Sequence, residues 1–313
     1  MSTINKSTFD PERDIPDLSG KVILITGGNT GLGFETLRHL ARHNPSHIYL
    51  AARSASKADA AIASIREETP SAPPITHIPL DLSSFSSVKS AAETFTSASP
   101  RLDILINNAG IMNSPYSLTP EGYEVQFGTN HMGPALLTHL LLPTLLRTAE
   151  DPNADVRVVN LTSEAYKMAQ LSGGLCLDPT KSKRYFTMVR YGGSKLANML
   201  HARALGRKYP QITAVSVHPG VIDTQLFDSS RALWKKIPLV GGALAGWMTG
   251  RLGTVADGAR NQLWAATAER EKVRSGFYFT PVGVKDNGNR YSSQEHAEKL
   301  WVWTEGELKK HGY

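Results

Sequence analysis

The feature that most constrains this chain is an apolar, β-branched run over residues 21–33 that stops at glycines and passes into an amphipathic stretch. A buried strand that delivers glycines to a helix start presents bare backbone N–H groups at the positive end of the helix dipole. After Thr26, the glycines stand at Gly27, Gly31 and Gly33, in a T-G-x-x-x-G-x-G spacing. The pattern favours a loop that binds a diphosphate. A strand-to-helix turn can also need glycine for conformational reasons alone.

Length and composition favour one intracellular domain. The chain has 313 residues, a length that open α/β sheets reach as a single unit, and no linker, repeat or low-complexity tract interrupts it. Residues 1–19 form a polar arm without the apolar core of a signal peptide, and no apolar run is long enough to span a membrane. The single cysteine, Cys176, indicates a free thiol in a reducing compartment. We therefore expect a cytoplasmic protein.

The charge pattern argues against nucleic acid as a partner. The net charge is +6, from 34 Lys and Arg against 28 Asp and Glu, and the excess is scattered along the chain. Nucleic-acid binding calls for a dense basic stripe with interleaved aromatic side chains. The modest excess suits an anionic small molecule, or it simply solvates the surface. No metal site is predicted.

The second predicted strand, residues 47–52, bears on the choice of nucleotide. Proteins that bind NAD(H) usually place Asp or Glu at the tip of this strand, where the carboxylate accepts hydrogen bonds from the ribose hydroxyls. Here that place holds Ala52, and Arg53 follows it. A guanidinium pairs with a 2′-phosphate that a carboxylate would repel. The sequence thus favours NADP(H), although Arg53 could instead begin an ordinary solvent-facing turn.

Two further strand ends carry candidate binding residues. The predicted strand 75–80 leads to Asp81 and Leu82. Asp81 would either accept a hydrogen bond from the adenine amine or cap the helix that follows. The next strand begins at Leu102 and runs into residues 107–110, which are Asn-Asn-Ala-Gly. Such small residues and amides would let a cofactor pass close to the backbone while tying two strand ends together.

Four polar residues later in the chain are candidate catalytic residues. A long helical pattern over about 121–148 contains Asn130, a poor helix former that needs a local partner such as a water or a backbone group. The fifth predicted strand, residues 156–162, is followed by Ser163. Tyr191 and Lys195 stand four residues apart, and such a pair lies on one face of a helix. The two glycines between them are expected to let that face approach a flat ligand.

Taken in order, these motifs resemble those of the short-chain dehydrogenase/reductase family. The matching set is Thr26-Gly27-x-x-x-Gly31-x-Gly33, Asp81-Leu82, Asn107-Asn108-Ala109-Gly110, Asn130, Ser163, Tyr191-x-x-x-Lys195 and Pro219-Gly220. A full set in sequence order over about residues 20–310 is far more specific than any one motif. The sequences around Asn130, Tyr191 and His218 are most similar to the retinol-dehydrogenase-like branch. Members of that branch often carry an N-terminal membrane anchor, which residues 1–19 lack.

The resemblance implies a single doubly wound Rossmann-type domain over residues 20–313, with a mostly parallel sheet of about seven strands. It also implies a nicotinamide cofactor, for which Arg53 favours NADP(H). The residues expected to bind this cofactor are those of the motifs and their neighbours. They are Gly27, Asn29, Thr30, Gly31, Leu32, Gly33, Arg53, Asp81, Leu82, Asn108, Ala109, Gly110, Tyr191, Lys195, Pro219, Gly220, Val221 and Thr224.

The resemblance also implies catalytic roles. Tyr191 would supply the proton in hydride transfer, and Lys195 would lower its pKa from the usual value near 10 while binding the nicotinamide ribose. Ser163 would hydrogen-bond the substrate oxygen, and Asn130 would hold a water that relays protons to the lysine. Ser163 could instead cap a strand end, and Asn130 could be a satisfied helix amide. His218 is interpreted as structural because Ser163 lacks a nucleophile-elbow motif.

Two variable segments, residues 164–190 and 227–250, are expected to bind the substrate and determine specificity. The second is apolar, is broken by glycines and contains Trp234, Trp247 and Met248, which suits a lid over a bulky hydrophobic compound. A basic segment that bears tryptophan could instead contact a membrane surface.

The predicted function is that of an NADP-dependent oxidoreductase. It would act as a carbonyl reductase or secondary alcohol dehydrogenase on an apolar, ring-containing small molecule such as a secondary metabolite. The alternative is a catalytically idle relative that binds NADP(H) as a sensor or scaffold protein. The sequence leaves the oligomeric state open, with a homodimer as one option.

Overall fold

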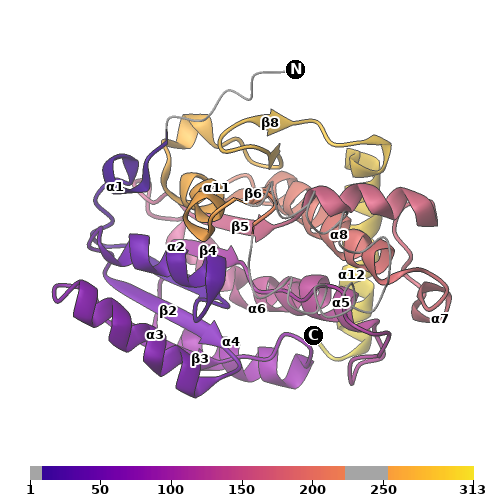
Figure 1. The fold of residues 1–313 in the computed structure, drawn as a ribbon, viewed down its shortest axis with the longest axis horizontal. Coiled ribbons are helices and arrows are strands. Elements are labelled where there is room, and N and C mark those ends of the chain that lie inside the picture. The colour runs from indigo at the N-terminus through magenta and orange to yellow at the C-terminus, as the bar shows by residue number, and fades with distance from the viewer. Residues whose placement is uncertain (1–8, 223–252) are drawn as a thin grey trace, which may run out of the picture.

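The computed structural model describes residues 9–222 and 253–313, which form an α/β domain around one sheet (Figure 1). The sheet has eight strands in the order β3-β2-β1-β4-β5-β6-β7-β8. All neighbours pair in parallel except β7 and β8, which are antiparallel. The strands are β1 (Val22–Thr26), β2 (His47–Ala52), β3 (Ile75–Pro79), β4 (Ile104–Asn107), β5 (Arg157–Leu161), β6 (Thr213–Val217), β7 (Tyr278–Phe279) and β8 (Lys285–Asp286). The doubly wound fold is confirmed, with eight strands rather than about seven because the short β8 turns back along β7.

Helices cover both faces of the sheet. One face packs against α4, α6, α8 and α12, and the other against α2, α3 and α11. The α-helices are α1 (Pro11–Asp14), α2 (Gly31–Ala41), α3 (Ala55–Glu68), α4 (Phe85–Ala98), α5 (Val125–Phe127), α6 (Gly133–Thr148), α7 (Pro179–Ser182), α8 (Thr187–Lys208), α11 (Val255–Thr267) and α12 (Gln294–Lys310). The short turns are a π-helix, η1 (Gly128–Met132), and 3₁₀ helices η2 (Glu164–Ser172), η4 (Arg270–Lys272) and η5 (Arg290–Ser292). Because the strand order reverses between β1 and β4, the loops after these strands diverge and leave a crevice at their carboxyl ends.

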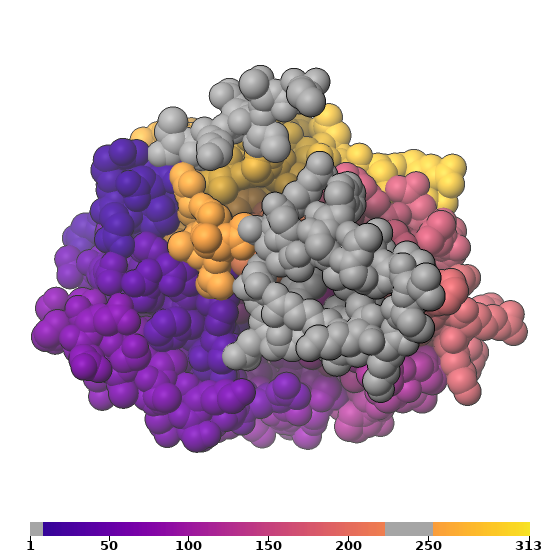
Figure 2. Space-filling view, viewed as in Figure 1, coloured from indigo at the N-terminus to yellow at the C-terminus, as the bar shows by residue number. Residues whose placement is uncertain are grey.

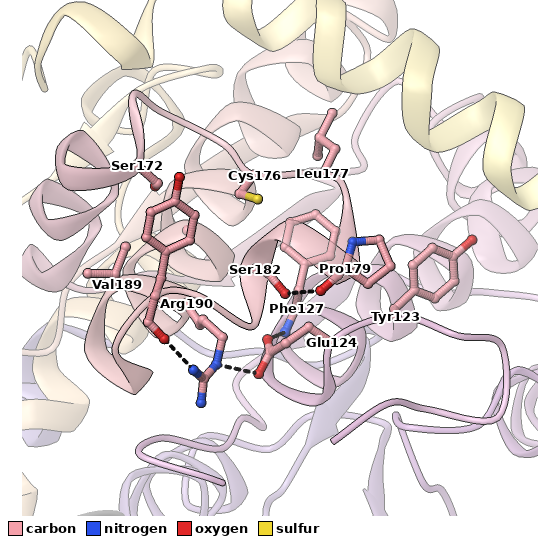
Figure 3. Close-up of a pocket in the computed structure, with 12 residues that line it drawn as sticks. Tyr123, Glu124, Phe127, Ser172, Cys176, Leu177, Pro179, Ser182, Val189 and Arg190 are labelled. Carbon is pink, nitrogen blue, oxygen red and sulfur yellow. Dashed lines mark hydrogen bonds and ion pairs between the residues drawn. The ribbon is translucent and has the colours of Figure 1, made fainter. Parts of the chain in front are cut away.

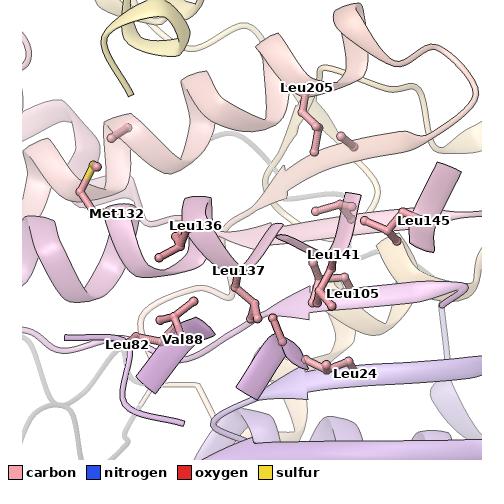
Figure 4. Close-up of a cluster of buried hydrophobic side chains, with 14 of the residues drawn as sticks. Leu24, Leu82, Val88, Leu105, Met132, Leu136, Leu137, Leu141, Leu145 and Leu205 are labelled. Carbon is pink, nitrogen blue, oxygen red and sulfur yellow. The ribbon is translucent and has the colours of Figure 1, made fainter. Parts of the chain in front are cut away.

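The apolar core has two parts, one on each face of the sheet. In the part shown in Figure 4, Leu24 of β1 and Leu105 of β4 pack with Leu136 and Leu141 of α6. The central strands are buried along their whole length, because helices cover both of their faces. Each leucine removed from water in this way contributes about 2 kcal/mol.

The last helix, α12, lies along α8 (Figure 1). The rings of Trp301 and His201 stack at 5.5 Å between centroids, and His131 Nε2 lies 3.3 Å from the hydroxyl of Thr304. His201 and His131 are both almost fully buried. The segment that contains α7 lies near the N-terminal end of α8 and forms a knob at the edge of the molecule (Figure 2).

The helix predicted over 121–148 is interrupted. Its first part is the three-residue α5, followed by the π-helical turn η1 and then by α6. Pro134 explains the interruption. In an α-helix the N–H of residue 134 would donate to the carbonyl of Asn130, and proline has no N–H. Within η1, the N–H of Gly133 reaches the carbonyl of Gly128, one residue further back than in an α-helix.

Candidate active site

Most of the expected binding residues line one cleft at the carboxyl ends of the strands. The cleft has a volume of about 440 Å³ and runs from the end of β2, past β1 and β4, to α8. The expected residues that line it are Gly27, Asn29, Thr30, Gly31, Leu32, Gly33, Arg53, Asp81, Leu82, Asn108, Ala109, Gly110, Tyr191, Lys195 and Pro219. Ser163 and Asn130 are not among the lining residues, but each bonds to a residue of α8: Ser163 to Tyr191, and Asn130 to Ser194.

The glycine loop is shaped by close contacts. Gly27 has a φ of +68°, and a Cβ on Gly33 would stand 2.2 Å from the carbonyl oxygen of Gly27. These positions therefore exclude side chains. Thr30 is the N-cap of α2, but its side chain makes no capping bond, so the first N–H groups of α2 stay available at the cleft. Such a terminus is suited to a diphosphate.

Two asparagines tie the strand ends together. Asn108 donates from its amide to the carbonyls of Thr26 and Gly27, at 2.8 and 3.4 Å, and so joins β4 to β1. The amide of Asn107 donates to Asn160 at 2.8 Å and joins β4 to β5. The strand-tying role inferred from the sequence is thus confirmed for Asn108, and the same role for Asn107 holds the next pair of strands.

The end of the cleft beside β2 is basic. Arg53 follows β2 and is exposed, and Lys57 lies in the first turn of α3, next along the same wall. Lys57 lies outside the sequence motifs and was not predicted. The sequence does carry a signal for Lys57. A cation in the first turn of a helix interacts unfavourably with the helix dipole, so a lysine at this position suggests a binding role. Ser54 caps α3 by accepting from the N–H of Lys57 at 3.3 Å, which places the lysine on the turn that faces the cleft.

Asp81 does not cap α4, and its contact with the adenine amine stays a prediction. Its Oδ1 accepts from the N–H and the hydroxyl of Ser83, at 2.9 and 2.7 Å, and so shapes the turn before α4. The N-cap of α4 itself is Ser84. Asp81 nevertheless lines the cleft, beside Leu82.

Tyr191, Lys195 and Ser163 converge at the other end of the cleft. Tyr191 and Lys195 are each 5% exposed, and Lys195 Nζ lies 5.7 Å from the centroid of the tyrosine ring. Ser163 hydrogen-bonds the Tyr191 side chain. Burial raises the pKa of Tyr191 to about 12, and the hydrogen bond with Ser163 acts against this rise. We expected the ammonium of Lys195 to lower this pKa, but in the structure the desolvation of the phenol outweighs any such effect.

Lys195 is held by backbone rather than by a carboxylate. Its Nζ donates to the carbonyl of Leu161 at 3.1 Å, and Asn198 Nδ2 donates to the same oxygen at 2.9 Å. Thr162 fixes the helix turn by donating to the carbonyl of Lys195 at 2.6 Å. Burial lowers the pKa of Lys195 to about 8, so the amine keeps its proton at neutral pH.

The Asn130 side chain is fully used by the protein. Its Oδ1 accepts from the N–H of Ile111 at 2.8 Å, and its Nδ2 donates to the Ile111 carbonyl and to Ser194 Oγ, both at 2.9 Å. The expected relay water would therefore have to hydrogen-bond the backbone carbonyl of Asn130. Pro134 leaves that carbonyl without an α-helical partner. A Cβ on Gly110 would lie 3.0 Å from Asn130 Oδ1 and 3.4 Å from Lys195 Nζ, so Gly110 keeps this corner open.

The glycines between Tyr191 and Lys195 do not face the cleft, contrary to the expectation from the sequence. A Cβ on Gly192 would stand 2.3 Å from the carbonyl oxygen of Ala165, so Gly192 admits η2 rather than a flat ligand. Gly193 lines a different cavity. The reason is helical geometry, because successive residues are rotated by about 100°.

Of the residues after β6, Pro219 lines the cleft, whereas the exposed Val221 and its neighbour Gly220 do not. Thr224 and the segment 227–250, with Trp234, Trp247 and Met248, lie outside the described residues. His218 is 7% exposed and burial lowers its pKa to about 4, which agrees with a structural role.

The cavity beside Gly193 lies under the segment that contains α7 (Figure 3). Val189, Arg190 and Gly193 of α8 line it, on the side of the helix turned away from Tyr191. At its base, Arg190 Nε donates to the buried Glu124 at 3.1 Å. Glu124 also accepts from the first N–H groups of α5, so the pair fixes α5 to α8.

Comparison with known proteins establishes the family. Residues 21–175 match a family model described as short chain dehydrogenase. The chain is 38% identical over 310 residues to the short-chain dehydrogenase/reductase drtF of Aspergillus calidoustus. The matched region covers 95% of this chain and 96% of that protein. The chain belongs to the short-chain dehydrogenase/reductase family.

Two further proteins are similar to this short-chain dehydrogenase/reductase. Retinol dehydrogenase 12 of Mus musculus is 37% identical over 289 residues, covering 91% of this chain and 85% of that protein. A solved structure of an uncharacterized protein from Mycobacterium paratuberculosis superposes with a TM-score of 0.67 at 30% identity, covering 95% and 96% of the two chains. The resemblance drawn from the motifs is confirmed. In the part of this short-chain dehydrogenase/reductase that the structure describes, no helix combines the length and apolar character that crossing a bilayer requires.

Proposed function

We propose that this protein is an NADPH-dependent carbonyl reductase, or a secondary alcohol dehydrogenase in the reverse direction, for apolar, ring-containing small molecules. The observation that carries the proposal is the meeting of Tyr191, Ser163 and Lys195 at one end of a cleft whose other end is basic. A phenol held by a hydroxyl beside a buried ammonium is an arrangement that can deliver a proton to a carbonyl oxygen.

The cleft fits a dinucleotide. The uncapped start of α2 and the glycines that exclude side chains suit its diphosphate. Arg53 and Lys57 suit a 2′-phosphate. When bound, the nicotinamide supplies the hydride.

The remaining chemistry falls to the chain's own side chains. Ser163 and Tyr191 would together bind the carbonyl oxygen, which polarises it before negative charge develops there. With a pKa raised to about 12, Tyr191 keeps its proton at neutral pH and can give it to that oxygen. Lys195, still charged below about pH 8, would stabilise the phenolate that results and hold the ribose.

The basic end of the cleft gives a prediction on cofactor choice. Arg53→Glu should lower the ratio of kcat/KM with NADPH to that with NADH by about 100-fold, because a carboxylate repels the 2′-phosphate and accepts from ribose hydroxyls. Arg66→Glu makes the same charge change at an exposed position on the far end of α3 and should leave the ratio unchanged. If both variants behave alike, the 2′-phosphate is recognised elsewhere.

The size and polarity of the substrate are the remaining part of the proposal. The segments 164–190 and 227–250 are proposed to close over it, as a lid does over a bulky hydrophobic compound. The similarity to retinol dehydrogenase 12 supports an apolar substrate class.

The test is loss of NADPH absorbance with a panel of cyclic ketones and aldehydes, followed by screening of metabolite extracts with deuterium-labelled NADPH. Deuterium incorporated at a carbonyl carbon supports the reductase. Tight NADPH binding without turnover or deuterium transfer across panel and extracts would instead favour the idle sensor.

A further inference from the structure

The turn that carries Ser163 is short and depends on its surroundings. Ser163 Oγ accepts from the N–H of Ala165 at 3.2 Å, and its carbonyl accepts from the N–H of Tyr166 at 2.8 Å. We refer to residues 163–166 as the serine turn. It opens the 3₁₀ helix η2, whose hydrogen-bond geometry is weaker than that of an α-helix. Its position must therefore come from contacts with other elements.

Two elements hold the serine turn from different directions. On one side, Gly192 of α8 lets the carbonyl of Ala165 approach closely. On the other side, the hydroxyl of Tyr278 in β7 donates to Glu164 Oε1 at 2.9 Å. The ring of Tyr166 packs edge-on against Tyr278, with 5.7 Å between centroids. Glu164 is the residue next to Ser163, so this bond fixes the turn next to the functional hydroxyl.

The two partners of Glu164 are not equivalent. Tyr278 is fully buried in β7, and its hydroxyl also hydrogen-bonds Thr280. Lys167 pairs with Glu164 Oε2, but its side chain is 51% exposed. An exposed ion pair within one helix contributes little. The bond from Tyr278 to Glu164 is partly buried, and a hydrogen bond to a carboxylate is stronger than one between neutral groups. Burial raises the pKa of Glu164, but the bonds from Lys167 and Tyr278 outweigh this and lower it, so the acceptor is a carboxylate.

We propose that Glu164 and Tyr278 are positioning residues that hold Ser163 in register with Tyr191. The proposal rests on the proposed function, in which Ser163 and Tyr191 share the substrate oxygen. Neither positioning residue needs to touch substrate or cofactor. The bond links the serine turn to β7, the strand beside the edge strand β8. Its loss would let Ser163 shift, and shifts of about 1 Å in such groups can cost about 100-fold in rate.

Four variants separate the hydrogen bond from the charge. Tyr278→Phe removes only the donor, and Glu164→Ala removes the acceptor. Glu164→Gln keeps an oxygen that can accept from Tyr278 but loses the charge, and Lys167→Met removes the exposed ion pair while leaving the Tyr278 bond. Hydrogen–deuterium exchange on each full-length protein measures the stability of the serine turn directly. The exchanging N–H groups of Ala165 and Tyr166 are those that hydrogen-bond to Ser163. A peptide from β1 serves as the internal control for global unfolding.

We expect Tyr278→Phe and Glu164→Ala to raise exchange in peptides covering 163–170 by about tenfold, with exchange in β1 unchanged. With a carbonyl that the wild type reduces, kcat should fall about tenfold in these two variants while the Kd for NADPH stays the same. Glu164→Gln should fall between the wild type and Glu164→Ala in both measurements, because its amide oxygen accepts from Tyr278 less strongly than a carboxylate does. Lys167→Met should leave exchange within about twofold of the wild type.

Unchanged exchange in Tyr278→Phe would overturn the positioning role, as would a loss in Glu164→Gln as large as that in Glu164→Ala. The exchange result does not depend on turnover. A wild type that reduces no carbonyl therefore counts against the proposed function, while the exchange data still decide whether Tyr278 holds the serine turn.

Discussion

Tyr191→Phe should lower kcat for carbonyl reduction by about 1000-fold, while the Kd for NADPH changes by no more than about threefold. The substitution removes one oxygen and keeps the buried ring that stands 5.7 Å from Lys195 Nζ. General acid catalysis contributes about 10²–10⁴-fold to such steps, and Ser163 alone cannot replace it because a serine hydroxyl is a far weaker acid. Steady-state turnover and a fluorescence titration with NADPH give the two quantities.

Tyr185→Phe is a matched control for this result. Tyr185 lines the cavity on the other side of α8, next to Arg190, and lies outside the cleft. Its loss of a hydroxyl should leave kcat within about twofold of the wild type. Near-normal turnover in Tyr191→Phe would mean that another group supplies the proton.

Acid should destabilise the fold at a pH where its carboxylates are still ionised. His201 is buried between α8 and α12, and burial lowers its pKa to about 4. In the unfolded chain its pKa is about 6.5, so below that pH the unfolded state binds a proton that the folded state does not. The stability contributed by the neutral ring is present above pH 6.5 and is lost as the pH falls toward 4. A shift of this size corresponds to about 3 kcal/mol.

His131 and His218 add to this loss, because burial lowers the pKa of each of them as well. Denaturant unfolding at a series of pH values measures the effect as the slope of unfolding free energy against pH. His201→Phe keeps a ring against Trp301 but cannot take a proton, so between pH 6.5 and 4 it should lose about 3 kcal/mol less than the wild type. His311→Gln, at an exposed position, should follow the wild-type slope. An identical slope in His201→Phe would show that this ring is not held neutral.

The fold and the cleft could be predicted because their determinants are local. Thr26, Gly27 and Gly33 form a strand-to-helix turn within a few residues, and the positions of Tyr191 and Lys195 follow from helical spacing. The ends of parallel strands gather at one edge of the sheet, which brought Asp81 and Asn108 to the same cleft without further information.

Other features of the site could not be predicted, because they depend on tertiary contacts between separate elements. Gly192 gives no sign in the sequence that it faces Ala165 rather than a ligand, because that contact joins residues from two separate elements. The pKa of Tyr191 depends on burial, which spacing alone does not give, and this is why the expected effect of Lys195 was overestimated. The π-helical turn was missed because the apolar pattern continues through it, although Pro134 marked the place.

The central claim is that the cleft holds NADPH with its reactive ring beside Tyr191. The most direct measurement is a titration of the purified wild-type protein with NADPH and with NADH, followed by protein fluorescence and by calorimetry. We predict saturable binding at one site per chain, with NADPH bound at least about tenfold more tightly than NADH. Failure of both nucleotides to bind, or tighter binding of NADH, would contradict it.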